Sequence, residues 1–312
     1  MSYVEDMGKE LSKRLVENKW EKKYKEIIEK SIKDDDVQLF LRENKDRLSH
    51  QEILKGASKL YEFVDLKQKI AEGKEVFAPG YSPQLTISDH HIEVTYVPTK
   101  KLIEERRLRE INNRINIVNL PKSIRKATLE NYYRDDDGRM IALKKAIEFV
   151  ANYTETPNIF HKGLYLSGSF GVGKTYLLGA IANKLAEKGI KVTLVHMPSF
   201  AVEIKNSIGK NTTMEKVDAL KKAPVLMMDD IGADQLSSWF RDDVLGVILQ
   251  YRMQEELPTF FSSNIALDDL EEFYLTQNTR GELEPLKAKR IMERIRFLVD
   301  EVVINGENRR NK

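Results

Sequence analysis

The chain of 312 residues contains no cysteine. This absence excludes disulfide bonds, thiol nucleophiles, iron–sulfur clusters and zinc sites built from cysteine. A strong net charge is also missing, since 51 Lys and Arg oppose 49 Asp and Glu, so any contact with nucleic acid must be local. No apolar run approaches the ~20 residues that cross a bilayer, and the polar segment 1–10 is unlike a signal peptide. We therefore expect a cytoplasmic protein with no membrane contact.

The length favours two domains. Residues 1 to about 75 are charge-dense, with apolar residues such as Leu11, Leu15 and Ile27 at helical spacing. Two alternating segments, 85–87 and 92–96, then predict a β-hairpin. Residues 100–126 hold nine Lys and Arg against three Glu, a net charge of +6. We therefore predict a smaller, mainly helical domain with a hairpin at 1–99, a basic linker at 100–126 and a second domain at 127–312.

The second domain has an α/β pattern. Short apolar segments at 163–166, 192–196, 225–228 and 259–262 alternate with the helical stretches 174–188, 199–222 and 236–256. Strands that alternate with helices are typical of a parallel sheet.

A phosphate-binding loop follows the first of these strands and precedes a helical stretch. It is made of Gly168, Ser169, Phe170, Gly171, Val172, Gly173, Lys174 and Thr175. This is GxxxxGK[ST] in the strand-loop-helix context that the motif requires. Glycines let backbone N–H groups face phosphates, and the helix N-terminus adds its positive dipole end. The motif predicts ATP binding, with Lys174 at the β- and γ-phosphates and Thr175 at Mg²⁺.

Two carboxylates end the strand at 225–228. A buried strand would deliver Asp229 and Asp230 to the carboxyl edge of the sheet, beside the loop. We expect Asp229 to hold Mg²⁺, through water, and Asp230 to polarise the attacking water. The plainer interpretation is a strand followed by an acidic turn.

Asn264 ends a further apolar strand, 257–263. In that place an amide can sense the γ-phosphate and orient water, or it can cap the next helix. Small-molecule kinases do not need this strand, so it favours an ATPase.

Arginines near the C-terminus offer cations to phosphate. Arg290 and Arg294 share one face of the helical segment 287–297. We predict Arg294 as an arginine finger that enters a neighbouring protomer, with a solvated helix face as the alternative. Arg309 either returns to its own phosphates or belongs to a frayed tail. Only 48 residues follow Asn264, too few for a helical lid domain.

Taken together, these motifs resemble the bacterial replicative-helicase loaders of the DnaI/DnaC type, in the initiator clade of AAA+ ATPases. The resemblance rests on GSFGVGKT, VLMMDDIGAD, SSWFRDDVLGVILQYRM, LPTFFSSN, KAKRIMERIR and GENRR, and in the first domain on FAPGYSPQL. It implies a lidless AAA+ domain in which Asn264 is sensor 1, Arg294 the finger and Arg309 sensor 2.

The resemblance also implies partners. A loader of this type binds the hexameric replicative DNA helicase, here through residues 1–99. It places the helicase on single-stranded DNA with other primosome initiator proteins, and it assembles as a homo-oligomer. Some relatives hold zinc in the first domain with Cys and His, but the comparable hairpin region of this chain offers only His90 and His91, so we expect no zinc.

Contacts with DNA would come from the helical segment 199–222, whose net charge is +2 (five Lys against three acids), or from the +6 segment. An ordinary solvated face is the alternative for both, and Phe200 is expected in the core. Two other functions stay open: an IstB-like ATPase helper for transposition, and an ATP-gated adaptor with negligible hydrolysis.

Overall fold

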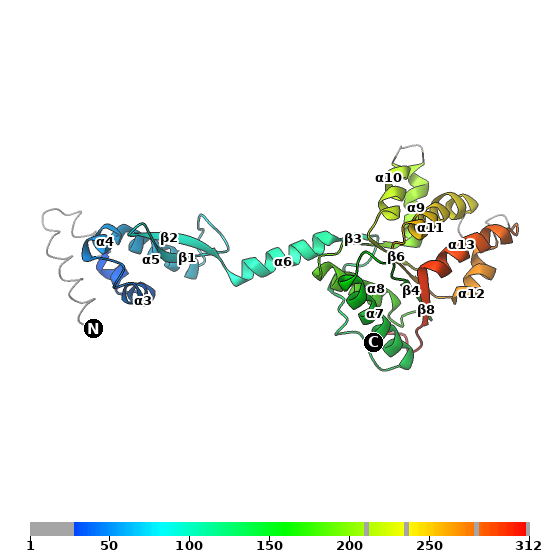
Figure 1. Cartoon of the computed structure of the whole chain (residues 1–312), viewed down its shortest axis with the longest axis horizontal. Coiled ribbons are helices and arrows are strands. Elements are labelled where there is room, and N and C mark those ends of the chain that lie inside the picture. The colour runs from blue at the N-terminus through cyan, green and yellow to red at the C-terminus, as the bar shows by residue number, and fades with distance from the viewer. Residues whose placement is uncertain (1–27, 209–211, 234–236, 278–280, 310–312) are drawn as a thin grey trace. The chain divides into compact units, whose positions relative to one another are not determined.

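The structure is a computed structural model, and it describes residues 28–309 apart from 209–211, 234–236 and 278–280. Leu11, Leu15 and Ile27 of the predicted N-terminal helices lie outside the described residues. The chain forms two compact units, Met1–Arg107 and Leu108–Lys312, coloured blue to cyan and cyan to red in Figure 1.

In the described residues of the first unit, helices α3 (Asp35–Glu43), α4 (His50–Lys55) and α5 (Ala57–Ala71) pack with a two-stranded sheet. Its strands are β1 (Tyr81–Ser88) and β2 (His91–Pro98). Asp34 caps α3, and Ser49 and Glu52 form a capping box on α4. Buried residues of the helices, such as Leu41 and Leu60, share one cluster with Ile92 of the hairpin. The predicted helices and hairpin are therefore confirmed within the described residues.

The boundary between the units differs from the predicted one. Helix α6 (Lys100–Arg114) has no buried residue, but β3 (Ile115–Val118) pairs in parallel with a strand of the second unit. The 3₁₀ helix η1 (Lys122–Lys126) packs there too, since a Cβ on Gly179 would lie 2.5 Å from Ile124 Cγ2. The linker predicted at 100–126 is therefore wrong beyond Arg114, and the second domain begins before residue 127. A short apolar run surrounded by basic residues hid the strand.

The second unit is built on a six-stranded parallel sheet of order β3-β5-β6-β7-β4-β8. The remaining strands are β4 (Gly163–Ser167), β5 (Val192–His196), β6 (Val225–Asp229), β7 (Thr259–Ser263) and β8 (Val299–Val303). The four predicted strands are confirmed, whereas β3 and β8 were not foreseen. Because β7 lies between β4 and β6, the loop after β4, Asn264 and the acidic pair come from three adjacent strands.

Helices cover both faces of this sheet (Figure 1). Leu166 and Phe260 face α7 (Asp137–Glu155) and α8 (Lys174–Glu187), whereas their neighbours Tyr165 and Phe261 face the other side. That side is covered by α9 (Met197–Ser207), α10 (Thr213–Lys221), the π-helical segments η2 (Phe240–Leu245) and η3 (Leu270–Leu275), α11 (Gly246–Gln254), α12 (Leu267–Asp269) and α13 (Pro285–Leu298). None of the helices described is both long and apolar enough to cross a membrane.

Arg252 of α11 ties the second face together. Its side chain is fully buried and donates to Thr259 Oγ1 and to four backbone carbonyls. Burial lowers the pKa of Arg252 to about 9. The carbonyls lie at the end of α10 and before β6 and β7, so this one guanidinium joins helix α10 to the sheet.

Candidate active site

The phosphate-binding loop, residues 168–175, crosses from the end of β4 to the first turn of α8. Gly168, Gly171 and Gly173 all have positive φ, at +149°, +75° and +104°. At Gly168 a Cβ would lie 2.0 Å from the carbonyl oxygen of Ile304, so no larger residue fits. Lys174 is buried, and its ammonium donates to Gly168 O (2.7 Å), Ser169 O (2.8 Å) and Asn264 Oδ1 (2.8 Å).

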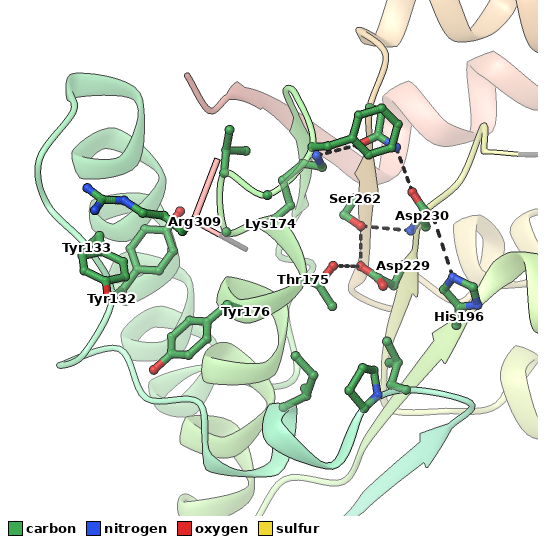
Figure 2. A pocket seen from close by; sticks show the side chains of 18 of the residues that line it. Tyr132, Tyr133, Lys174, Thr175, Tyr176, His196, Asp229, Asp230, Ser262 and Arg309 are labelled. Atoms are coloured by element: carbon green, nitrogen blue, oxygen red, sulfur yellow. Dashed lines mark hydrogen bonds and ion pairs between the residues drawn. The ribbon is translucent and has the colours of Figure 1, made fainter. Parts of the chain in front are cut away.

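Asp229 lies at the carboxyl end of β6 and faces the loop. Its Oδ1 accepts hydrogen bonds from Thr175 Oγ1 (2.8 Å) and Ser262 Oγ (2.6 Å), as Figure 2 shows. Burial raises the pKa of Asp229, and the two hydroxyls oppose that rise. A buried carboxylate beside a threonine hydroxyl is an oxygen donor set of the kind that Mg²⁺ prefers.

Asp230 turns the other way, with a positive φ of +64°, a conformation that aspartate tolerates better than most residues. Its Oδ1 accepts from Asn264 Nδ2 at 3.1 Å, and its Oδ2 lies 3.7 Å from His196 Nε2. Asn264 thus joins Lys174 to Asp230 through its two amide atoms. The three predicted residues meet at one point.

Ser262 and His196 were missed in the sequence. The hydroxyl of Ser262 donates to Asp229 and accepts from the backbone N–H of Asp230 at 3.0 Å, so it links the two acids. His196 ends β5 opposite Asp229 in the sheet register. A serine inside an apolar strand and a histidine at a strand end gave no separate signal.

A cavity of about 740 Å³ opens over these groups, within the range of about 300–1,000 Å³ usual for small-molecule sites. Its far end is lined by Tyr132, Tyr133 and Tyr176 and by the segment 119–121. The rings of Tyr132 and Tyr176 stack with centroids 6.2 Å apart. The Tyr132 hydroxyl is buried and has no hydrogen-bond partner among the described residues, and burial raises the pKa of Tyr132 to about 12.

Arg309 lines the same cavity. Its guanidinium lies 4.6 Å from the centre of the Tyr133 ring (Figure 2), and it pairs with Asp135. The C-terminal arginine that we proposed for phosphate contact therefore lies beside the loop, whereas the frayed-tail alternative disagrees with this position.

Arg290 and Arg294 of α13 lie outside the cavity lining. Arg294 is partly buried and donates from Nη1 to Gly246 O at 2.7 Å. Burial, and then the charge of Arg290, lower the pKa of Arg294. Arg290 is exposed, so either arginine can still be the finger, and Arg294 must first leave Gly246.

The candidate DNA segments carry partly neutralised charge. Lys216 pairs with Glu203, and Lys221 and Lys222 pair with Asp218. Lys210 lies outside the described residues. Phe200 is buried in the core, as predicted.

His90 and His91 sit at the turn of the β1–β2 hairpin and at the start of β2. His90 Nδ1 lies 3.3 Å from Glu52, and His91 Nδ1 lies 2.6 Å from Asp89 O. Within residues 28–309, leaving out the gaps 209–211, 234–236 and 278–280, no group of three or more His, Asp or Glu is arranged to hold a metal ion. The prediction of no zinc stays a prediction.

A phosphate-binding loop, an acidic strand end and an intervening strand that ends in Asn264 define a P-loop ATPase domain. Comparisons with known proteins agree. Residues 4–96 match the family described as "Primosomal protein DnaI N-terminus", and residues 92–312 match "IstB-like ATP binding protein".

Relatives extend the match to the whole chain. The replicative helicase loader DnaI of Bacillus subtilis (strain 168) is 37% identical over 315 residues, which cover 99% of this chain and 100% of that protein. A crystal structure of DnaI is 46% identical and covers 64% of this chain and 100% of its own, with a TM-score of 0.55. A putative primosome component from Streptococcus pyogenes serotype M3 is 46% identical, with coverages of 64% and 98% and a TM-score of 0.54.

The chain therefore belongs to the DnaI family of helicase loaders, and its second unit is an IstB-like ATP-binding domain. The resemblance expected from the sequence is confirmed. The match at residues 4–96 favours a loader over the IstB-like transposition helper, because the two share only the ATP-binding part.

Proposed function

We propose that this chain is an ATP-dependent loader that binds the hexameric replicative helicase and helps deliver it to single-stranded DNA with primosome initiator proteins, in the cytoplasm. One observation carries the proposal. A set of groups suited to ATP hydrolysis, from Lys174 to Asn264, lies in a chain that is similar over its full length to a replicative helicase loader.

In the ATP site, Lys174 and the backbone N–H groups of residues 168–175 bind the phosphates, and Arg309 adds a second cation. Thr175 and Asp229 hold Mg²⁺. The distance of 2.8 Å between Thr175 Oγ1 and Asp229 Oδ1 and the burial of the carboxylate support this assignment. Bound Mg²⁺ supplies charge neutralisation at the β- and γ-phosphates.

For hydrolysis, Asp230 orients and polarises the attacking water, and Asn264 holds Asp230 and senses the γ-phosphate. We propose slow turnover, because aspartate is short and its Oδ1 already accepts from Asn264. Arg294 from a neighbouring protomer is the finger, so full activity requires a homo-oligomer.

Helicase binding belongs to residues 1–99, with α6 as the connection. The first unit buries its own core, and Phe77, between α5 and β1, is 96% exposed. An apolar ring in water on a self-contained unit suits a protein contact.

The test uses the full chain and fragments 1–107 and 108–312 in pull-downs of the replicative helicase. We expect capture by the full chain and by 1–107, and weaker capture by the full chain with Phe77→Ser. Capture by 108–312 alone would contradict this division of labour.

Hydrolysis is measured with and without single-stranded DNA for the native chain, Lys174→Ala and Asp230→Asn. Both variants should lower turnover, and Lys174→Ala should also weaken ATP binding. If neither variant changes turnover, the chain is an ATP-gated adaptor.

The finger is tested by mixing. Arg294→Ala and Lys174→Ala protomers should each be inactive, and a mixture should regain part of the activity because some interfaces pair an intact ATP site with an intact finger. As the matched comparison, Arg290→Ala protomers are mixed with Lys174→Ala protomers in the same way. If only this second mixture regains activity, Arg290 is the finger.

A further inference from the structure

Residues 304–309 fold back along the phosphate-binding loop. The backbone N–H of Ile304 donates to Ser167 O at 2.7 Å, and that of Arg309 donates to Gly171 O at 3.0 Å. Asn308 lies so close that a Cβ on Gly171 would be 1.9 Å from Asn308 Oδ1. We call residues 304–309 the C-terminal strap. Backbone hydrogen bonds hold its first end to the last residue of β4 and its last end to the loop.

One buried side chain fastens the strap and the loop to α7. Arg139, in the first turn of α7, has a side chain only 1% exposed. Its Nε donates to Val172 O at 3.1 Å, and its Nη2 donates to Glu307 O at 2.9 Å. Gly306, with φ +116°, packs flat against the guanidinium, since a Cβ there would lie 3.0 Å from Arg139 Cζ.

Asp135 is shared between this buried arginine and the arginine of the strap. Arg139 Nη1 donates to Asp135 Oδ1 at 2.6 Å, and Arg309 Nη2 donates to Asp135 Oδ2. A buried cation needs a counter-charge, so Arg139 holds Asp135 in place. The second oxygen of Asp135 is then fixed and aims at Arg309.

This contact uses only one edge of the Arg309 guanidinium. Its Nε is buried and has no hydrogen-bond partner in the part of the chain that the structure describes, although the residue lines the ATP cavity. The Tyr133 ring supports the guanidinium from one face. The orientation of Arg309 is therefore set before any phosphate arrives.

We propose that Arg139 and Asp135 are positioning residues, which fix Arg309 at the ATP site through the network Arg139–Asp135–Arg309. The proposal rests on the proposed function, since it takes the phosphates of ATP as the ligand of Arg309. Its physical basis is pre-organisation: a long cationic side chain that is already ordered loses less conformational entropy when it binds an anion.

The experiment measures equilibrium binding of ATP and ADP to the full chain by calorimetry. The variants are Asp135→Asn, Arg309→Ala and the double variant, with Asp137→Asn as the matched control because Asp137 is an exposed carboxylate two residues away. We expect Asp135→Asn to weaken ATP binding about three- to tenfold, the scale of a partly exposed ion pair. Asp137→Asn should bind as the native chain does.

Non-additivity separates positioning from a general structural effect. If Asp135 acts through Arg309, the double variant should bind ATP as weakly as Arg309→Ala alone. Arg139→Lys, which keeps the charge but loses the directed bonds, should resemble Asp135→Asn. Thermal unfolding without nucleotide checks that each variant is folded.

Unchanged or tighter ATP binding by Asp135→Asn, while Arg309→Ala weakens it, would overturn the proposal, as would additive losses in the double variant. Lys174→Ala reports on the proposed function separately. If that variant binds ATP as the native chain does, the assignment of the ATP site fails, whereas its loss of binding together with inert Asp135 variants refutes only the positioning role.

Discussion

Replacing Ser262 by alanine removes one hydroxyl from the acidic end of the ATP site. That hydroxyl donates to Asp229 Oδ1 at 2.6 Å and accepts from the backbone N–H of Asp230 at 3.0 Å. The hydrogen bond to the carboxylate is worth about 1.5–3 kcal/mol, and the buried amide left without an acceptor costs about 1–3 kcal/mol. Both acids lose the bond that fixes their relative orientation.

Hydrolysis should suffer more than ATP binding, because Ser262 touches neither the loop nor Arg309 in the described contacts. If this orientation stabilises the transition state by about 1.5–3 kcal/mol, its loss lowers turnover about 10- to 100-fold. ATP affinity should stay within about twofold. Steady-state hydrolysis and calorimetry on the same preparation measure the two quantities.

Ser263→Ala is the matched control. Ser263 is also fully buried on β7, but its hydroxyl donates to Ile231 O at 2.6 Å and accepts from the backbone N–H of Ile265. The two variants should lose similar unfolding free energy in urea, and only Ser262→Ala should lose turnover. Equal losses of turnover in both variants would refute the reasoning.

Three further changes test other parts of the second unit. Asp229→Asn should abolish hydrolysis and raise the unfolding free energy of the nucleotide-free protein at neutral pH, on the order of 1 kcal/mol. Because burial raises the folded-state pKa of Asp229 above 3.8, its stabilising contribution is present below that value and is lost as the pH rises through the raised pKa. The difference in unfolding free energy between variant and native protein, measured in urea, should therefore shrink as the pH falls. A difference that does not change with pH would contradict this cause. Tyr132→Phe removes a buried hydroxyl that has no partner in the part of the chain that the structure describes, so thermal unfolding without ATP should be unchanged or shift upward; a large drop would mean that the hydroxyl has a partner in the free protein. Arg252→Met removes the guanidinium from four carbonyls, of which Pro258 O keeps the backbone N–H of Leu226, and should cost about 3–5 kcal/mol in urea unfolding, whereas a variant of native stability would show that water replaces the guanidinium.

The sequence predicts those site residues that follow an apolar strand directly. Asp229 ends one strand, Asn264 directly follows another, and Lys174 ends the loop that begins after a third; parallel strands bring their carboxyl ends to one edge. The hydrogen bonds of Asn264 with Lys174 and Asp230 could not be foreseen in detail, but the proximity of these residues could. This proximity follows from the strand order, which places β7 between β4 and β6.

Other residues could not be predicted, because their roles depend on long-range packing. Arg139 and Glu307 are 168 positions apart and meet only when the strap returns to α7. Ser262 is one small residue within an apolar strand, where serine has no distinctive pattern. Strand β3 was missed for a different reason. Its four residues follow the basic helix α6 and are too few to show a strand pattern among the charged residues around them.

The contacts of Lys174 connect phosphate binding with the attacking water. Its ammonium donates to Asn264 Oδ1 at 2.8 Å, and the amide nitrogen of the same side chain donates to Asp230 at 3.1 Å. A γ-phosphate that bonds to Lys174 competes with Asn264 for the ammonium, since a charged phosphate oxygen is the stronger acceptor. Asn264 then has a free carbonyl oxygen, and its amide must reorient or take the phosphate as a new partner. In either case the hydrogen bond that restrains Asp230 changes when phosphate oxygens take the Lys174 ammonium as their partner. We propose that this one asparagine, at the end of the strand between those of the loop and the acidic pair, couples phosphate binding at Lys174 to the orientation of Asp230.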